Sequence, residues 1–367
     1  MKDLRFAPVA RKSATLHDLP YASSERKCFH QWIVNVTPPG RNNCLHGCAY
    51  CYARDAVYAR NEPGVLQYYE GLAAQVEREL ARLRLCPPVS ISNVTDPCQP
   101  VPELKREVRE LVGMLVERGV SFSLTTKGDA TFLADLLASP RRGSACLAVT
   151  IEGPAAVLEL LSPAAPPFEE RLASVQRLSP LLPVMVRVDP VFPPLLAALY
   201  GDAWKTEMRA LLRRAGEAGA THIVSSTGRM NVEGKARVAA IIAEMSPEEA
   251  ERFERGYRFD RSRTAPGYML PHPERLAFHR EMRGWAEESG MTYAVCQELR
   301  ADEADSAGIP HCEGFSLPFC ERGLDGRFHP IDGCTANCRV TCAGQAHPPC
   351  GRGELVSHLP FKRAYLT

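Results

Sequence analysis

The sequence contains no long apolar run, no excess of charge of either sign and few aromatic residues. Lys and Arg number 44 against 43 Asp and Glu, a net charge of +1, and Phe, Trp and Tyr together make up 7%. The missing apolar run argues against a membrane-spanning helix, and the balanced charge argues against a basic nucleic-acid-binding coat. The N-terminal segment also lacks the apolar core of a secretory signal, so we expect a cytoplasmic protein.

Cysteine, by contrast, is abundant, with 14 residues in a chain of 367. In a reducing compartment, cysteines in this number serve as metal or redox ligands rather than as disulfides. Apolar residues make up 45% of the chain, which is enough to bury a core and argues against global disorder. The sequence therefore predicts a globular, metal-binding or redox-active protein.

Short strand-like segments alternate with helix-like segments over most of the chain. The strand candidates are rich in β-branched residues and lie at 32–37, 89–95, 121–126, 146–152, 183–189, 221–225 and 292–296. Helical patterns lie at 69–85, 103–118, 130–138, 168–178, 194–218 and 273–289. This order predicts an α/β fold, a partial (β/α)6-type barrel of parallel strands, with its chemistry at the C-terminal strand ends.

The alternation divides the chain into three predicted parts. Residues 1–30 are polar and predict an N-terminal surface segment, and residues 31–300 form the barrel. Residues 301–367 are an irregular Cys-rich extension, in which six cysteines, from Cys312 to Cys350, lie among many Gly and Pro. We expect this extension to need a metal or the barrel itself in order to fold.

Three cysteines, Cys44, Cys48 and Cys51, follow the first strand in a C-x3-C-x2-C spacing, with Gly47 between them. One tight loop of this kind is able to wrap a small cluster, and iron–sulfur clusters are held by thiolates, normally four to a cubane. Three local thiolates leave one iron open, as catalytic metal sites leave a coordination position open. A zinc loop completed by His46, or three unrelated thiols, is the alternative.

The triplet, with Tyr50 directly before its last cysteine, resembles the radical S-adenosylmethionine (SAM) superfamily over roughly residues 30–300. The resemblance implies a [4Fe–4S] cluster on the three cysteines, with SAM on its fourth iron. It also implies reductive cleavage of SAM to a 5′-deoxyadenosyl radical that abstracts a hydrogen atom from substrate. The closer resemblance, carried by CAYCY at 48–52 and VTD at 94–96, is to the spore photoproduct lyase-like branch.

That branch contacts SAM through a hydroxyl after strand two, a lysine after strand three and a hydroxyl on strand four. Thr95, Lys127 and Thr150 stand at similar spacings here, and with Tyr50 they form the implied SAM-binding set. The Lys127 ammonium is expected to pair with the SAM carboxylate as a point charge. The alternative for Lys127 is a solvated turn residue, and the alternative for Thr150 is a β-branched residue that fills the core.

Two further residues are candidates at the strand ends. Arg187 is expected to bind a carboxylate of SAM or of the substrate. The alternative is a buried ion pair with Asp189, because residues two apart on a strand lie on the same face. The branch also carries a cysteine that returns a hydrogen atom to the product radical, where this chain has Asn93. Cys98, five residues later, is the substitute we predict as catalytic, and a buried small hydrophobe is the alternative.

In the extension, Cys334, Cys338 and Cys342 are spaced four residues apart, and on a helix such residues share a face. With Cys320 they supply four thiols for a second [4Fe–4S] cluster, and the sequence therefore predicts one cluster at the triplet and a second in the extension. Cys312 and Cys350 are further candidate ligands. A structural zinc or redox-active free thiols are the alternatives.

The resemblance implies a radical SAM enzyme, of lyase or transferase type, with [4Fe–4S] and SAM as cofactors. It implies an electron donor such as flavodoxin or ferredoxin, and a small-molecule, peptide or nucleic-acid substrate, with no membrane partner. Two other functions stay open: a DNA lesion repair or recognition protein of the spore photoproduct lyase type, and a non-catalytic iron–sulfur or zinc protein. The balanced charge weakens the DNA alternative, because phosphate contacts dominate DNA affinity.

Overall fold

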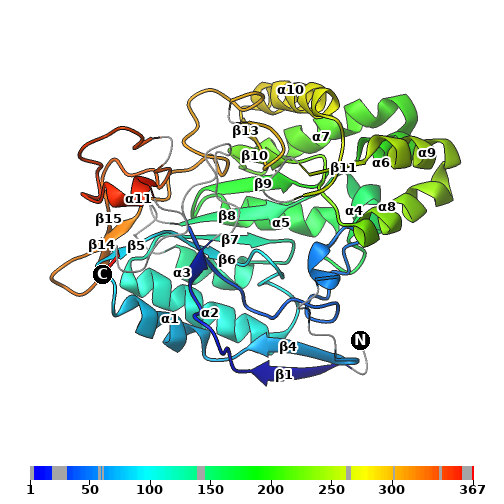
Figure 1. Cartoon of the computed structure of the whole chain (residues 1–367). Coiled ribbons are helices and arrows are strands. Elements are labelled where there is room, and N and C mark those ends of the chain that lie inside the picture. Colours follow the sequence, from blue (N-terminus) through cyan, green and yellow to red (C-terminus); the bar gives the residue numbers. More distant parts are fainter. Residues whose placement is uncertain are drawn as a thin grey trace.

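An open sheet of eight strands forms the centre of the protein (Figure 1). The computed structural model describes residues 4–18, 31–56, 59, 62–138, 145–261, 266–300, 302–338, 341–357 and 366–367. The strand order in the sheet is β13-β10-β9-β8-β7-β6-β3-β2. Neighbours from β13 to β3 pair in parallel, and β2 alone is antiparallel to its neighbour β3. This is the α/β partial barrel that the sequence predicted.

The strands of the central sheet are β2 (His17–Asp18), β3 (Trp32–Val34), β6 (Val89–Ile91), β7 (Phe122–Thr126), β8 (Ala145–Thr150), β9 (Val184–Val188), β10 (His222–Ser225) and β13 (Thr292–Val295). The smaller sheets use β1 (Arg5–Val9), β4 (Val65–Tyr69), β5 (Leu85–Cys86), β11 (Arg258–Asp260), β12 (Gly267–Met269), β14 (Cys320–Arg322) and β15 (Phe328–Pro330). All seven strands that the sequence predicted are present, and each is somewhat shorter than predicted.

The helices are α1 (Leu72–Leu80), α2 (Pro102–Arg118), α3 (Ala134–Leu137), α4 (Ala155–Leu161), α5 (Phe168–Leu178), α6 (Pro193–Tyr200), α7 (Trp204–Glu217), α8 (Val232–Met245), α9 (Pro247–Gly256), α10 (His272–Glu288) and α11 (Glu354–Ser357). Helix α2 shows how they pack: Leu104, Val108, Leu111 and Leu115 form one fully buried stripe, and Gly119 ends the helix with a φ of 75°. No helix in the described part of the chain is both long and apolar enough to cross a bilayer.

Three predicted helices differ from those observed. Residues 65–69 form strand β4, which pairs with β1, so α1 begins only after Gly71 at a φ of 64°. The segment 130–138 forms a 3-10 turn followed by the short helix α3. The segment 194–218 is two helices, α6 and α7, because Gly201 interrupts it at a φ of 52°. Four further helices, α4, α8, α9 and α11, were not predicted, although Asn231 and Ser246 are local N-cap signals for α8 and α9.

Residues 302–319 pack along the edge strand β13 and against the start of β10. The carbonyl oxygen of Cys312 lies 2.9 Å from Nε2 of His222, the first residue of β10, and Gly314 packs directly on the His222 ring. A Cβ atom on Gly314 would lie 2.4 Å from the ring, so only glycine fits there. Asp305 and Ser306 also bond the backbone of β13. We call residues 302–319 the plug segment.

The plug segment makes the stability of the fold depend on pH. Burial lowers the pKa of His222 from 6.5 to about 4, with Arg187 contributing, while the bond to the Cys312 carbonyl opposes the shift. As pH falls from about 6.5 towards 4, the unfolded chain binds a proton that the folded chain does not, so the unfolding free energy falls. We expect His222→Gln to reduce this loss, as measured by urea unfolding at pH 7 and pH 5.

The control is His329→Gln, because His329 is exposed on β15. That variant should keep most of the wild-type dependence on pH. Equal pH dependence in wild type and His222→Gln would show that His222 does not titrate as its buried position requires.

Candidate active site

The cysteine loop, residues 44–51, follows the C-terminal end of β3 and lies over the C-terminal ends of the parallel strands. Two amides anchor its start: Leu45 N donates to Gln99 Oε1 at 2.8 Å, and Gln99 Nε2 donates to the Asn43 carbonyl at 3.2 Å. Cys48 is 9% exposed, and Cys44 and Cys51 are partly buried. The loop is therefore anchored at its start, and its three cysteines follow one another within one short irregular segment.

A buried carboxylate, Asp96, joins the cysteine loop to β6 and β7. Its oxygens accept from Cys98 N at 2.8 Å, from Thr126 Oγ1 at 2.6 Å and from Lys127 N at 2.6 Å. His46 of the loop lies with Nε2 at 3.2 Å from Asp96 Oδ2. Burial opposes the charge of Asp96, but His46, Thr126 and Lys127 outweigh it and hold the pKa of Asp96 well below its usual range.

A second buried carboxylate, Glu152, follows β8 and has no exposed surface. Tyr50 of the cysteine loop donates to Glu152 Oε1 at 2.6 Å, and Arg171 of α5 donates to Oε2 at 2.6 Å. Lys127 Nζ lies 3.4 Å from Oε1 and 5.6 Å from the centre of the Tyr50 ring. Burial opposes ionisation, but Lys127, Arg171 and Tyr50 lower the pKa of Glu152 to about 2. Glu152 is therefore a carboxylate at neutral pH.

Helix α8 clamps the cysteine loop from the side. Arg237 donates to the Ala49 carbonyl at 2.7 Å and to Asp55 Oδ2 at 2.7 Å, and its Nη2 lies 3.4 Å from the Cys51 carbonyl oxygen. Gly234 packs on the Tyr50 carbonyl, which a Cβ atom would approach to 3.3 Å. The sequence analysis missed this contact, because nothing in the sequence links α8 to a loop so much earlier in the chain.

The thiols of the cysteine loop lie in a setting suited to a cationic cluster. Burial is the main cause that raises the pKa of Cys48 to about 11, with Glu152 and Cys51 adding to it and Lys127 opposing it. Burial, then Cys48 and Asp96, also raises the pKa of Cys44. Thiolates in this position need a nearby positive charge, which bound iron supplies.

His46 Nδ1 is buried and has no hydrogen-bond partner within the described chain, as expected of a polar atom beside a bound group. Within the described ranges, no three His, Cys, Asp or Glu side chains converge on a single ion position. His46 instead faces Asp96, so it does not complete a zinc site with the three thiols of the loop. The donor set fits a thiolate-bound iron–sulfur cluster.

The structure places the other predicted SAM-binding residues around this loop. Thr95 is buried, and its hydroxyl accepts a hydrogen bond from Thr37. Thr150 is buried at the end of β8, and its carbonyl accepts from Arg171 at 3.0 Å. Lys127 is the least buried of the set, with 15% of its side chain exposed. Its charge is retained because Glu152 and Cys48 outweigh the burial, so that the pKa of Lys127 is raised.

The predicted hydrogen donor, Cys98, is 2% exposed and lies beneath the turn after β7. Gly128 of that turn sits directly on its backbone, where a Cβ atom would come within 2.2 Å of the Cys98 carbonyl oxygen. Burial, then Asp96, raises the pKa of the Cys98 thiol well above its ordinary value. The structure therefore gives Cys98 the surroundings of a buried small side chain, and its catalytic role stays a prediction.

Arg187 forms the buried pair that the sequence left as the alternative. Its Nη2 donates to Asp189 Oδ2 at 2.6 Å and to Cys296 Sγ at 3.3 Å, and Nη1 lies 3.5 Å from Glu313 Oε1. Glu313 belongs to the plug segment and was missed by the sequence analysis. Two carboxylates thus flank Arg187 inside the barrel, and its predicted contact with SAM stays a prediction.

The predicted ligands in the extension separate into two places. Cys334, Cys338 and Cys342 lie near one another, in turns rather than on the helix that their spacing suggested. Cys320 lies in β14, where it pairs in register with Cys86, and its Sγ is 3.1 Å from Ser121 Oγ. The spacing of these cysteines in the sequence did not show that Cys320 lies in a strand while the other three lie in turns.

Comparisons with known proteins agree with this geometry. No protein-family model matches the chain. A radical SAM Nalpha-GlyT isomerase of Pseudomonas phage M6 is 24% identical over 354 residues, which cover 91% of this chain and 71% of that protein. Two solved structures of spore photoproduct lyase share the fold with TM-scores of 0.56 and 14% identity. One is a mutant with bound AdoMet and dinucleoside spore photoproduct, and it covers 79% of this chain and 81% of its own. The other is the enzyme complexed with dinucleoside spore photoproduct, covering 79% and 82%.

The similarity to the phage isomerase over nearly the whole chain, together with the fold shared with spore photoproduct lyase, supports membership of the radical SAM superfamily of enzymes. The cofactors that these relatives imply are SAM and a [4Fe–4S] cluster.

The clamp by α8 generates a prediction about cluster retention. Arg237→Gln removes a charge-assisted hydrogen bond to the loop, worth about 1.5–3 kcal/mol, so the cluster should be lost to an iron chelator about tenfold faster or more. Decay of the visible absorption during chelation measures the rate. Arg213→Gln, which breaks an exposed pair with Glu217, is the control and should leave the rate unchanged. Equal rates in both variants would show that α8 does not hold the loop.

Proposed function

We propose that the protein binds a [4Fe–4S] cluster through Cys44, Cys48 and Cys51 and uses SAM to start a radical reaction on an organic substrate. When bound, cluster and SAM supply a 5′-deoxyadenosyl radical that removes a hydrogen atom from the substrate. The observation that carries the proposal is the position of these three thiols above the C-terminal strand ends, beside two buried carboxylates. The similarity to a radical SAM isomerase supports it.

The chain's own residues would position SAM and exclude water. Lys127 is charged and slightly exposed, and we assign it to the SAM carboxylate, with Glu152 holding its ammonium in place. Tyr50 links the cysteine loop to the same Glu152. Thr95 and Thr150 line the same strand ends as hydroxyl contacts. Arg187, held by Asp189 and Glu313, we assign to contacting the substrate rather than SAM.

We further propose that the reaction conserves oxidation state overall, as an isomerase or lyase does. The phage relative is named an isomerase, and the solved structures that share the fold are of a lyase. A flavodoxin or ferredoxin would supply the electron that the cofactor chemistry requires. The protein would work in the cytoplasm.

Lys127→Ala tests the SAM assignment. It should weaken SAM binding by about tenfold to a hundredfold, because one charge-assisted contact is lost, and should leave the iron content unchanged. Equilibrium binding of SAM to anaerobically reconstituted protein measures the first quantity, and iron analysis the second. Lys205→Ala, which removes an exposed lysine on α7, is the control. Unchanged SAM affinity in Lys127→Ala would refute the assignment, and no 5′-deoxyadenosine from the reduced wild type would refute the proposed function.

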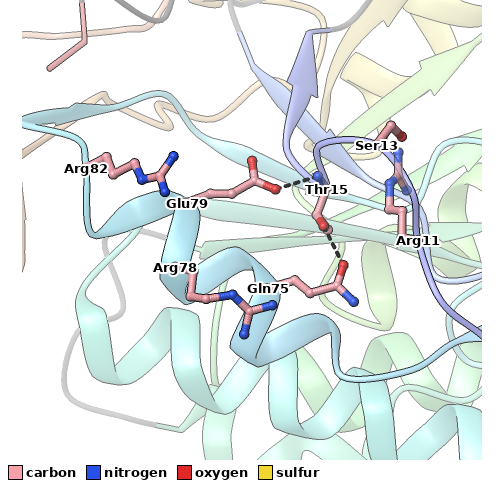
Figure 2. Close-up of a pocket in the computed structure, with 7 residues that line it drawn as sticks. All are labelled: Arg11, Ser13, Thr15, Gln75, Arg78, Glu79 and Arg82. Carbon is pink, nitrogen blue, oxygen red and sulfur yellow. Dashed lines mark hydrogen bonds between the residues drawn. The ribbon is translucent and has the colours of Figure 1, made fainter.

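A second candidate function, action on a nucleic acid, is favoured by a basic cavity outside the barrel. The cavity, of about 350 Å³, lies between the segment before β2 and helix α1 (Figure 2). It is lined by Arg11, Ser13, Thr15, Gln75, Arg78, Glu79 and Arg82. Glu79 is engaged by the backbone of Thr15 and Leu16, and Arg11 donates to the Ala14 carbonyl and lies over the Tyr69 ring. We therefore assign Arg78 and Arg82 to a ligand in this cavity. Guanidinium and hydroxyl donors suit a phosphate.

If the substrate is a nucleic acid, these arginines contact its backbone. Arg78→Gln with Arg82→Gln should then reduce the slope of log affinity against log salt by about 1 to 2, since each phosphate contact adds about one unit. Fluorescence anisotropy with a labelled DNA duplex at several salt concentrations measures the slope. Arg213→Gln is again the matched surface control. An unchanged slope, or no binding at low salt, would reject this candidate.

A further inference from the structure

Three polar side chains stand side by side where strands β9, β10 and β13 end. These strands are neighbours in the sheet (Figure 1), and Asp189, Ser226 and Cys296 each come directly after the last residue of one of them. Arg187 lies two residues before Asp189, so its side chain is on the same face of the sheet. Arg187 is also paired in register with Thr150 of β8, one of the residues that we assign to SAM. The group therefore lies beside the SAM residues.

Both carboxylate oxygens of Asp189 are engaged within this group. Ser226 donates to Oδ1, and Arg187 Nη2 donates to Oδ2 at 2.6 Å. The same guanidinium nitrogen also donates to Cys296 Sγ at 3.3 Å. Asp189 therefore fixes the position of Arg187 and has a partner for each of its oxygens.

A second carboxylate, that of Glu313, approaches Arg187 from the plug segment. The backbone on either side of Glu313 is held against His222, through the Cys312 carbonyl at 2.9 Å from Nε2 and through Gly314 on the ring. The Glu313 side chain is 14% exposed, and its Oε1 lies 3.5 Å from Arg187 Nη1. Within the described part of the chain, no other donor lies within hydrogen-bond or ion-pair distance of this carboxylate. Glu313 therefore keeps acceptor sites for a donor that these residues do not supply.

The charges of this group do not balance. Arg187 is in ion-pair contact with both Asp189 and Glu313, so one positive charge meets two negative ones. Around Glu152 the ratio is reversed, since two cations face that one carboxylate. The surplus positive charge there suits the carboxylate of SAM. The surplus negative charge beside Arg187 suits a cation, because a carboxylate at such a place is costly without one.

The chemistry of Glu313 narrows the kind of cation. Burial is the main cause that raises the pKa of Glu313, with Asp189 adding to it and Arg187 opposing it, so a bound cation would favour its ionised form. Within the described ranges, no three His, Cys, Asp or Glu side chains converge on a metal position. A guanidinium would use both oxygens of the carboxylate, one of which already faces Arg187. The compact ammonium group of a protonated amine needs only one oxygen.

We propose that Glu313 accepts a hydrogen bond from a protonated amine of the substrate, and that the substrates of this enzyme are therefore cationic amines. The proposal rests on the proposed function, because it names the substrate class of the same site. Arg187, which we assign to contacting the substrate, lies 3.5 Å from Glu313 and would bind an oxygen of the same molecule. The plug segment, which supplies Glu313, thereby determines which substrates the site accepts.

Binding of small amines to the reconstituted protein, with SAM present, tests this assignment. The probes are butylamine and glycinamide at pH 7, each compared with its hydroxyl isostere, butanol or glycolamide. Wild type should bind each amine about tenfold more tightly than its isostere, because a charge-assisted hydrogen bond is gained. Glu313→Gln should lose this preference and keep its affinity for SAM. Saturation-transfer difference NMR measures the probes, and equilibrium binding measures SAM.

The matched control is Glu303→Gln, which removes another carboxylate of the plug segment, one that pairs with His272. This variant should keep the wild-type preference for amines. The proposal is overturned if wild type shows no preference, if the preference survives in Glu313→Gln, or if Glu313→Gln weakens SAM binding as much as amine binding. SAM cleavage without an amine preference counts against this proposal alone. An amine preference without 5′-deoxyadenosine from the reduced wild type counts against the proposed function alone.

A second measurement on the wild type locates the bound amine, and it decides if Glu313→Gln fails to fold. Cys296 is partly buried and lies beside Arg187, so an amine held by Glu313 should slow its alkylation by iodoacetamide. Peptide mass spectrometry measures the rate at Cys296 with each amine and with each isostere. Protection by the amines and not by the isosteres supports the proposal, and equal rates overturn it.

Discussion

The carboxylate of Glu152 is the group on which the arrangement of the site depends. It is fully buried and is held by three partners from different parts of the chain: Tyr50 of the cysteine loop, Lys127 after β7 and Arg171 of α5. A carboxylate in such a position is stable only while its partners stay, and removing one costs about 3–5 kcal/mol. The same interaction that fixes the loop therefore fixes the lysine that we assign to SAM.

Asp96 repeats this principle on the next strand, with His46 of the loop on one side and the backbone of Lys127 on the other. The two carboxylates also raise the cost of ionising the loop thiols, which burial has already made difficult. The apo loop is thus a poor place for thiolates, and iron relieves the conflict by adding positive charge. We infer that cluster binding and loop order are coupled.

The sequence predicted the parts of this account that local patterns encode. The seven β-branched segments became the seven parallel strands, and the C-x3-C-x2-C spacing placed three thiols in one loop after the first of them. What it did not predict depends on contacts between distant residues. Arg171 and Arg237 are ordinary helical arginines in the sequence, and only packing brings them to Glu152 and to the cysteine loop. The same reason explains why the cysteine spacing in the extension misled: Cys334, Cys338 and Cys342 suggested a helical face, whereas the structure places them in turns.

The chemistry that we propose depends on the cysteine loop at the C-terminal ends of the parallel strands. The electron paramagnetic resonance spectrum of the reduced, reconstituted protein tests the central claim most directly. The account predicts a signal that changes when SAM is added, because SAM binds the open iron held by Cys44, Cys48 and Cys51. The change should persist in Cys338→Ala and disappear in Cys48→Ala. A wild-type spectrum unaffected by SAM, or a SAM-dependent change that survives in Cys48→Ala, would contradict it.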